Sequence, residues 1–299
     1  MIISPKNSWT VPTDGSFRLD QALCAPPREA LLDKKAARKA LKKQVKRLDD
    51  LQRRLYADDS HSVLMIFQAM DAAGKDSTIR AVFTGVNPAA FQVSSFKKPS
   101  ANELDQDFLW RTTRALPQRG RIGVFNRSYY EEVLVIRVHP EYLGAQKLPP
   151  DAVPENLDEL WAQRFESIAD HERHLARNGT VILKFWLNVS REEQKRRFLR
   201  RLDVPEKNWK FSAGDVAERG HWEDYMTAYE DALRHTSKPW APWFAIPAGD
   251  KPFMRMTVAR IVADTLESMG LRYPEVDDKE RARFDEMRRL LLDEGTTGE

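Results

Sequence analysis

A stretch in the first third of the chain has the residue types and the spacing needed to bind phosphate. It reads Ala69-Met70-Asp71-Ala72-Ala73-Gly74-Lys75-Asp76-Ser77. In the common pattern G-x-x-x-x-G-K-[ST], backbone N–H groups and a helix N-terminus surround the phosphates while the lysine balances their charge. Gly74 and Lys75 match, whereas Ala69 replaces the first glycine and Asp76 stands at the Ser/Thr position, followed by Ser77. We predict a phosphate-binding loop with contacts from Ala72 to Ser77; an ordinary strand-to-helix turn is the alternative.

Asp71 lies inside this stretch. A carboxylate beside several phosphates would be repelled unless a cation stood between them. We therefore predict that Asp71 is a metal ligand and that Mg²⁺ is the cofactor. The alternative is that the Asp71 side chain caps the backbone of the loop.

A second informative stretch is Ile122-Gly123-Val124-Phe125-Asn126-Arg127-Ser128-Tyr129-Tyr130. It lies where a kinase with a phosphate-binding loop carries a further strand, whose final acidic residue contacts the metal or the acceptor. Asn126 occupies that position here. An amide can accept a hydrogen bond from water or bind a metal weakly, but it cannot act as a base.

The segments that must position these residues alternate between two patterns. Short apolar runs, typical of strands buried on both faces of a parallel sheet, occur at 62–68, 91–95, 122–125, 181–189 and 243–247. Helical patterns separate them at 101–116, 128–136, 157–177, 191–202, 213–233 and 252–269, and another helix begins near Ser77. This alternation predicts an α/β fold with a doubly wound parallel sheet.

The two ends of the chain differ from its middle. Residues 1–27 are rich in proline and poor in apolar residues, which predicts an irregular surface arm that adds nothing to the core. A long amphipathic helix is expected over 28–56 as the start of a single domain spanning 28–272, with a surface insertion at 140–154. Residues 273–299 are predicted to be a C-terminal helix and a tail that frays after Leu292.

Composition narrows the functional class. The 299 residues include one cysteine, Cys24, which excludes an intrachain disulfide and a four-cysteine metal site. The N-terminus lacks the design of a secretory signal, and no apolar run approaches the roughly 20 residues needed to span a bilayer. We expect a soluble cytoplasmic protein. The net charge of +3 does not by itself demand a polyanionic partner.

Basic residues nevertheless gather in two segments. Between Lys34 and Arg47 basic pairs recur every fourth residue, which would form one continuous stripe on a helix. A second cluster lies between Arg191 and Arg201. Taken alone, either cluster could be a solvated helix face.

Four stretches together resemble a known family, polyphosphate kinase family 2. They are MDAAGKDSTIR (70–80), FKKPS (96–100), FNRSYYEEVLVIRVHPE (125–141) and APWFAIPAGDK (241–251), and the resemblance runs from about residue 30 to 270. Most branches of that family carry Asp-Arg-Ser-Trp-Tyr after the second strand. The Asn-Arg-Ser-Tyr-Tyr-Glu-Glu found here looks like the branch that accepts both AMP and ADP.

The resemblance implies a thymidylate-kinase-like P-loop fold whose helical lid, at about 190–235, closes over a basic channel. Inorganic polyphosphate and adenine nucleotides are then the expected partners, with no nucleic acid and no membrane. A row of Lys and Arg suits a chain that carries about one negative charge per phosphate. The resemblance therefore implies donor contacts from Arg197, Arg200 and Arg201, while the stripe from Lys34 to Arg47 fits a solvated face equally well. By analogy, the chain is expected to form a homo-oligomer, a dimer or tetramer.

The reaction expected from this resemblance is in-line transfer of the terminal phosphoryl of polyphosphate to a phosphate oxygen of AMP or ADP. Such an oxygen is already ionised, and positioning and charge neutralisation dominate. Lys75, Asp71 with its Mg²⁺, and Arg127 are the expected catalytic residues. Four residues are expected to bind the acceptor nucleotide: Lys97, Lys98, Asn126 and Glu131. For Lys97 and Lys98 a plain surface loop is the alternative. Glu131 and Glu132 are candidates for ordering metal-bound water or contacting the acceptor, and an exposed helix face is the alternative for both.

Other readings of the same residues stay open. An ATP-dependent nucleoside monophosphate kinase would share the loop and the fold, and a non-catalytic nucleotide-sensing or nucleic-acid-binding module would fit the altered loop. The pair His171 and His174 is one residue short of a zinc-binding spacing, so a surface helix is the better interpretation. Trp240 and Trp243 are interpreted as core and strand-entry residues.

Overall fold

A computed structural model describes residues 1–293, apart from the side chain of Pro150. Its centre is one five-stranded sheet in the order β2-β3-β1-β4-β5, with every neighbouring pair parallel. The strands are β1 Ser62–Gln68, β2 Phe91–Ser95, β3 Ile122–Asn126, β4 Thr180–Asn188 and β5 Trp243–Pro247. All five predicted strands are confirmed. Apolar runs buried between two layers of helices form β1, β3, β4 and β5. The predicted burial is wrong for β2, an edge strand that buries none of its five residues.

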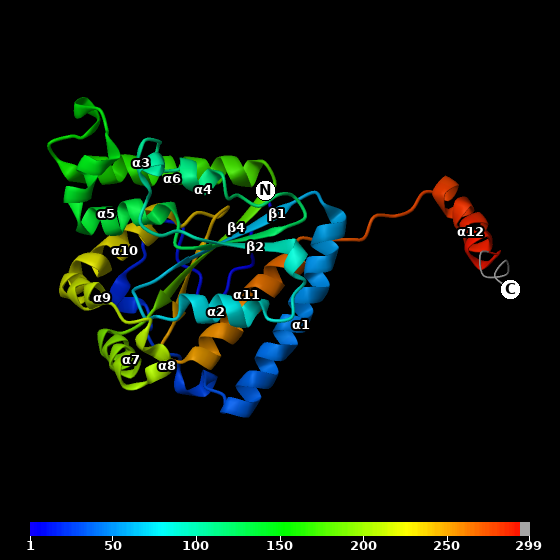
Figure 1. Cartoon of the computed structure of the whole chain (residues 1–299), viewed down its shortest axis with the longest axis horizontal. Helices are drawn as coiled ribbons and strands as arrows, with labels where there is room; N and C mark the ends of the chain where they lie inside the picture. Colours follow the sequence, from blue (N-terminus) through cyan, green and yellow to red (C-terminus); the bar gives the residue numbers. More distant parts are fainter. Residues whose placement is uncertain (294–299) are drawn as a thin grey trace.

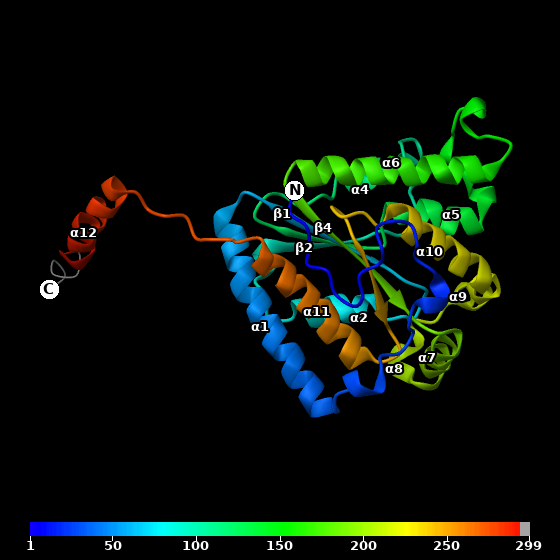
Figure 2. The ribbon, with the colours of Figure 1, turned by 180° about the vertical axis from the view of Figure 1, so that it is seen from behind.

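Helices cover both faces of this sheet (Figures 1 and 2). One face carries α1 (Lys34–Asp58), α2 (Lys75–Phe83) and α11 (Lys251–Ser268), and α11 packs against both α1 and α2. The other carries α6 (Leu157–Arg177) and α10 (Trp222–Thr236), which pack against each other and against the 3-10 helix η4 (Tyr129–Val133). The prediction of a doubly wound α/β fold is confirmed.

Several predicted helices are shorter or broken. The expected helix over 101–116 is two short ones, because a capping box of Ser100 and Glu103 starts the first and Asp107 caps the backbone N–H of Leu109 before the second. The expected helix over 128–136 begins instead as η4, and that over 213–233 is interrupted at Arg219–His221, around Gly220. The remaining α-helices are α3 Ala101–Leu104, α4 Trp110–Thr113, α5 Val135–Val138, α7 Arg191–Asp203, α8 Pro205–Asn208, α9 Ala213–Glu218 and α12 Asp278–Asp293.

The first and last helices also differ from expectation at their ends. The single turn Arg28–Ala30 is 3-10, and α1 proper begins only after Asp33, whose side chain accepts hydrogen bonds from the N–H groups of Lys35 and Ala36. At the other end α12 buries no residue and stands away from the rest of the chain (Figure 1). The predicted fraying after Leu292 concerns residues that, from 294 onward, lie outside the described part.

The N-terminal arm is irregular, as predicted, but the prediction that it adds nothing to the core is wrong. Val11 and Phe17 are buried in the main hydrophobic cluster. The backbone N–H of Val11 donates to the carbonyl of Trp243 at 2.9 Å, and that of Ala245 donates to the carbonyl of Trp9 at 2.9 Å. Because β5 is an edge strand, its outer backbone groups need partners, and the arm provides them.

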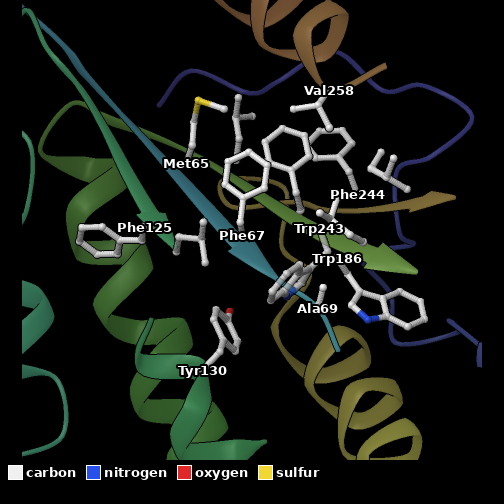
Figure 3. Close-up of a cluster of buried hydrophobic side chains, with 14 of the residues drawn as sticks. Met65, Phe67, Ala69, Phe125, Tyr130, Trp186, Trp243, Phe244 and Val258 are labelled. Atoms are coloured by element: carbon white, nitrogen blue, oxygen red, sulfur yellow. The ribbon is translucent and has the colours of Figure 1, made fainter. Parts of the chain in front are cut away.

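Aromatic side chains fill the core on both faces of β1, β4 and β5 (Figure 3). Phe67, Phe185 and Phe244 are register partners on the three neighbouring strands and stack in a row, with ring centroids 5.0 and 5.5 Å apart. Trp243 is fully buried against Tyr130, which confirms its interpretation as a core residue. This packing holds the carboxyl ends of the strands at one common edge. No helix among the described residues is long and apolar enough to cross a membrane.

Candidate active site

The predicted phosphate-binding stretch is a tight loop between β1 and α2. Ala72 and Gly74 both have positive φ, at 60° and 113°. A Cβ at Gly74 would lie 3.2 Å from the Cε of Met254, so both the conformation and the available space favour glycine there. The helix begins at Lys75, two residues before the predicted start, and its N-terminus faces the loop.

Lys75 turns back over this loop. Its Nζ donates to the carbonyl of Ala69 at 2.6 Å, and burial lowers the pKa of Lys75. The neighbouring Asp76 accepts a hydrogen bond from Nδ2 of Asn126 at 2.7 Å, which ties the start of α2 to the end of β3. The predicted loop residues and Asn126 therefore lie together.

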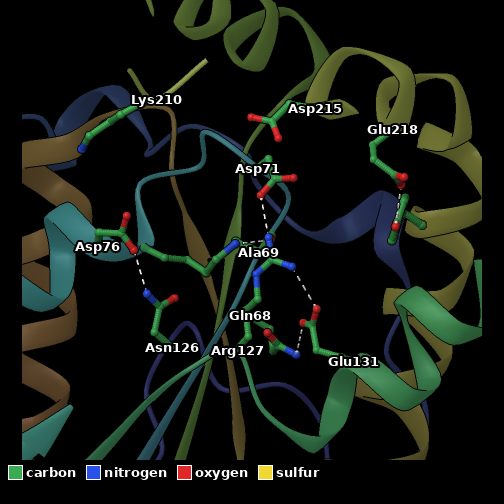
Figure 4. Close-up of polar contacts among 12 residues, drawn as sticks. Gln68, Ala69, Asp71, Asp76, Asn126, Arg127, Glu131, Lys210, Asp215 and Glu218 are labelled. Atoms are coloured by element: carbon green, nitrogen blue, oxygen red, sulfur yellow. Dashed lines mark hydrogen bonds and ion pairs between the residues drawn. The ribbon is translucent and has the colours of Figure 1, made fainter. Parts of the chain in front are cut away.

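Arg127 follows β3 directly and comes beside the loop because β3 and β1 are neighbours. Its backbone has φ 64° and its N–H donates to the carbonyl of Phe67 at 3.0 Å. The guanidinium lies between two carboxylates, 3.0 Å from Asp71 and 3.1 Å from Glu131 (Figure 4). The charge of Glu131 is the main cause of the raised pKa of Arg127. The structure thus brings together two places in the sequence, Asp71 in the loop and the pair Arg127 and Glu131 after β3.

Lys97 and Lys98 follow β2 at the same edge of the sheet. The backbone there is held by a hydrogen bond from the N–H of Phe96 to the carbonyl of Asn126, at 3.0 Å. Arg111 donates to the carbonyl of Lys97 at 2.8 Å. Both lysine side chains are exposed, which leaves them available to an anion.

Arg197, on α7, is bound to the outer side of the loop. Its exposed fraction is 8%, and it donates to the carbonyls of Ala72, Ala73 and Ala248 at 3.1, 2.6 and 2.5 Å and to Glu193 at 2.6 Å. The carbonyl of Ala73 and the N–H of Gly74 belong to one planar trans peptide. By fixing that carbonyl, Arg197 also fixes the direction of the Gly74 N–H. A donor contact from Arg197 stays a prediction.

The two other predicted lid arginines have different surroundings. Arg200 is exposed. Arg201 donates to Asp215 at 2.9 Å and to the carbonyl of Lys210 at 3.1 Å, joining α7 to α9. Burial, and after it the nearby charge of Asp71, raises the pKa of Asp215.

A pocket opens beside Asp71 and Arg127, between the loop, η4 and the helices α7, α9 and α10. Sequence reasoning missed most of its lining. Gln194 donates to the carbonyl of Asp71 at 2.9 Å, and Arg219 donates to Oε1 of Gln194 at 2.6 Å. The further lining residues that were not predicted are Ala69, Met70, Leu134, Val135, Asp215, Glu218, Tyr225 and Tyr229.

The carboxylates of this pocket fit the predicted metal. Within residues 1–293 no group of three or more His, Cys, Asp or Glu side chains could hold a metal ion by itself. Mg²⁺ does not need such a group, because in phosphoryl-transfer sites one or two carboxylates share it with water and substrate phosphates. Asp71, beside the phosphate-binding loop, is a carboxylate of the required kind.

Two glutamates lie elsewhere than expected. Glu132 is not on an exposed helix face: it is buried, paired with Arg164 at 2.9 Å and hydrogen-bonded to Gln146. The segment that contains His171 and His174 was interpreted as a surface helix. Glu172 lies between these two histidines and is fully buried on the inner side of α6. That interpretation is therefore wrong for Glu172.

Comparison with known proteins gives consistent relatives. A family profile described as Polyphosphate kinase 2 (PPK2) matches residues 31–274. The chain is 55% identical over 253 residues to an ADP-polyphosphate phosphotransferase of Rhodopseudomonas palustris, covering 84% of this chain and 86% of the relative. It is 45% identical over 242 residues to an AMP/ADP-polyphosphate phosphotransferase of Meiothermus ruber, covering 81% and 85% of the two chains.

Solved structures agree with the sequence relatives. The crystal structure of Polyphosphate Kinase 2 from Arthrobacter aurescens matches with a TM-score of 0.81 and 36% identity, covering 96% of this chain and 99% of that one. The predicted family resemblance, from about residue 30 to 270, is therefore confirmed by a family match over residues 31–274. With its loop, its sheet order and these relatives, the chain belongs to the polyphosphate kinase 2 family.

Proposed function

We propose that this chain transfers the terminal phosphoryl group of inorganic polyphosphate to ADP and AMP. Family membership and the names of the relatives from Rhodopseudomonas palustris and Meiothermus ruber support this activity. The observation that carries it is the placement of Arg127 between Asp71 and Glu131 at the mouth of the loop that holds Lys75. Cationic groups thereby face the place where a phosphoryl group would move.

The residues contribute mainly position and charge. Lys75 leaves the carbonyl of Ala69 and balances the phosphates that enter the loop, together with the N-terminus of α2. Arg127 neutralises charge that develops on the transferred group, the role an arginine has in many phosphoryl transfers. An ionised acceptor phosphate needs no strong base, so Asn126 at the end of β3 is compatible with the reaction.

Asp71 would hold the divalent cation, which we propose to be Mg²⁺. When bound, such an ion neutralises phosphate charge and helps to orient donor and acceptor. Lys97 and Lys98 would contact the phosphates of the acceptor nucleotide, and Asn126 and Glu131 would border it. Arg200 and Arg201 would contact the polyphosphate chain on the side of α7, and Arg197 would hold the loop.

The decisive experiment uses purified protein with Mg²⁺, long-chain polyphosphate and either ADP or AMP, without ATP, and follows the nucleotides by chromatography. The proposed activity produces ATP from ADP, and ADP then ATP from AMP. With AMP, an ATP-dependent monophosphate kinase would make ADP only when ATP is supplied, and with ADP it would form ATP and AMP whether or not polyphosphate is present. A non-catalytic binding module would bind nucleotide without any turnover.

Two further parts of the proposal concern the setting of the enzyme. We propose a cytoplasmic site of action, where adenine nucleotides are abundant and the free thiol of Cys24 is stable. We also propose a homo-oligomer, a dimer or tetramer, because α12 exposes Phe284, Met287 and Leu291, which a second copy could cover. Light scattering of the full chain and of a chain ending at residue 272 tests the second point.

A further inference from the structure

A charged pair lies in the middle of the hydrophobic core, outside the pocket described above. Lys184, in the centre of β4, and Glu172, on α6, are both fully buried, and Nζ of Lys184 is 2.6 Å from Oε2 of Glu172. Lys184 also donates to the hydroxyl of Tyr130 at 2.9 Å and to the carbonyl of Thr236 at 2.7 Å. Oε1 of Glu172 accepts from the hydroxyls of Tyr129 and Tyr130, both at 2.9 Å.

Stability alone does not explain this arrangement. Burial lowers the pKa of Lys184 to about 8 and raises that of Glu172, which expresses the desolvation of both charges. Apolar residues of similar volume in place of a buried ion pair are often neutral or stabilising, by roughly 1–4 kcal/mol. The tyrosine hydroxyls and the Thr236 carbonyl give each charge its hydrogen bonds. The pair instead fixes the relative positions of the elements that it connects, β4, α6, η4 and the end of α10.

One of the connected elements, η4, begins two residues after the proposed catalytic arginine, Arg127. Tyr129 and Tyr130 are separated from Arg127 only by Ser128, which is fully buried. Arg127 has a positive φ of 64°, a conformation that costs a non-glycine residue roughly 1–3 kcal/mol and persists only when its surroundings impose it. Tyr129 and Tyr130, whose hydroxyls bind Glu172 and Lys184, fix the backbone that follows Arg127. Glu131, the carboxylate partner of Arg127, comes directly after them.

The other connected element, α10, contributes side chains to the lining of the same pocket. Thr236 is the last residue of α10, and its Oγ1 accepts a hydrogen bond from Nε1 of Trp243 at 2.9 Å. The same helix carries Tyr225 and Tyr229, which line the pocket with Arg127 and Glu131. Figure 3 shows Tyr130 and Trp243 facing each other in the core. The buried pair therefore joins η4 to α10.

We propose that Lys184 and Glu172 are positioning residues for phosphoryl transfer, which hold Glu131 on η4 and Arg127 just before η4 in fixed relation to α10. This inference rests on the proposed function. A displacement of about 1 Å in a reacting constellation can lower turnover roughly 100-fold. Loss of the network should therefore lower kcat more than it changes the affinity for either substrate.

The test compares two variants of the full chain. Tyr129→Phe with Tyr130→Phe cuts the links from the pair to η4 and leaves the charges paired. Adding Lys184→Met and Glu172→Leu makes the whole cluster apolar without leaving a single buried charge. Leu48→Ala is the control for lost stability, because the Leu48 side chain on α1 is fully buried and lies outside the pocket. Each is measured with polyphosphate and ADP, and each is repeated in an Arg127→Ala background.

We expect both variants to fold and to lose roughly 10- to 100-fold in kcat, with KM for ADP and for polyphosphate within about threefold of wild type. Leu48→Ala should lower the melting temperature and leave kcat at 25 °C unchanged. In the Arg127→Ala background the two variants should cause little further loss, because the residue through which they act is gone. A purely structural role predicts the same fold-loss in both backgrounds.

Failure of the inference and failure of the proposed function give different results. Wild-type protein that makes no ATP from polyphosphate and ADP refutes the function. Wild-type turnover with unchanged kcat in the folded tyrosine variant, or equal losses with and without Arg127, overturns the positioning role. Independently of activity, a crystal structure of the tyrosine variant should show Arg127 displaced from Glu131. An unchanged Arg127 there also overturns it.

Discussion

Arg197 offers a direct choice between two roles, a contact with the donor chain and a support for the phosphate-binding loop. Arg197→Met removes the guanidinium while keeping much of the apolar stem. It leaves the carbonyls of Ala73 and Ala248 without their donor, and both residues are almost completely buried. A buried acceptor that loses its partner costs roughly 1–3 kcal/mol, so after partial relaxation we expect a loss of about 3 kcal/mol.

A loss of this size is measurable in a chain of 299 residues. At roughly 2–4 °C per kcal/mol, the melting temperature should fall by about 6–12 °C. Because the Gly74 N–H loses its fixed direction, kcat should fall at least about tenfold, as expected when a reacting group is misplaced. KM for polyphosphate should change less than about twofold, since uniform donor binding is retained.

Arg200→Met, three positions along α7, is the matched control. Arg200 is exposed, so the same chemical change should leave the melting temperature unchanged. It should raise KM for polyphosphate and make the dependence of that KM on salt concentration less steep. Thermal unfolding and steady-state kinetics at two salt concentrations measure both variants. If Arg197→Met kept its stability and behaved like Arg200→Met, the loop-support argument would be refuted.

Three other outcomes follow from the same geometry. Lys75→Ala should lower kcat by roughly 100-fold or more while circular dichroism shows an intact fold; near-normal turnover would contradict the role given to Lys75. Gly74→Ala and Gly85→Ala should both destabilise by roughly 1–3 kcal/mol in urea unfolding, since both glycines have positive φ, but only Gly74→Ala should lose turnover. Burial and the charges of Arg197, Arg255 and Arg200 lower the pKa of Lys251 to about 8, below its value in the unfolded chain. A charged Lys251 therefore destabilises the folded chain fully below pH 8, and this destabilisation decreases as the pH rises toward 10.5. Lys251→Met should be more stable than wild type at pH 7, by roughly 1–2 kcal/mol after solvent screening. The difference between the two urea midpoints should be smaller at pH 9.5.

The sequence predicted an element correctly where one physical requirement, such as burial on both faces of a strand, determined the residue types. Strands such as 62–68 and 181–189 are read easily because burial on both faces requires an unbroken apolar run. The meeting of Lys75 with Arg127 follows from two parallel neighbours whose carboxyl ends share one edge. Helix 101–116 was mispredicted because a capping box and an Asp cap, which are local hydrogen bonds, broke an otherwise helical pattern.

Other parts of the site depend on distant packing. Gln194, Asp215 and Tyr229 meet at the pocket only because α7, α9 and α10 fold over the loop, and no spacing along the chain encodes this. Glu172 did leave a signal. It shares the apolar face of its helix with Phe165 and Ile168, at offsets of seven and four residues, and Lys184 interrupts an apolar run. Two opposite charges at two such positions indicate a buried pair.

The strand-like contact between the N-terminal arm and β5 bears on how the protein can be shortened. The family match starts at residue 31, so a chain trimmed to that boundary would lack Trp9 and Val11. The carbonyl of Trp243 and the N–H of Ala245 would then face water along an open, aromatic-rich edge of the sheet. Open margins of this kind recruit strands from other molecules. The N-terminal arm thus protects the edge strand β5 from pairing with other molecules, and a shortened chain would lack this protection against aggregation.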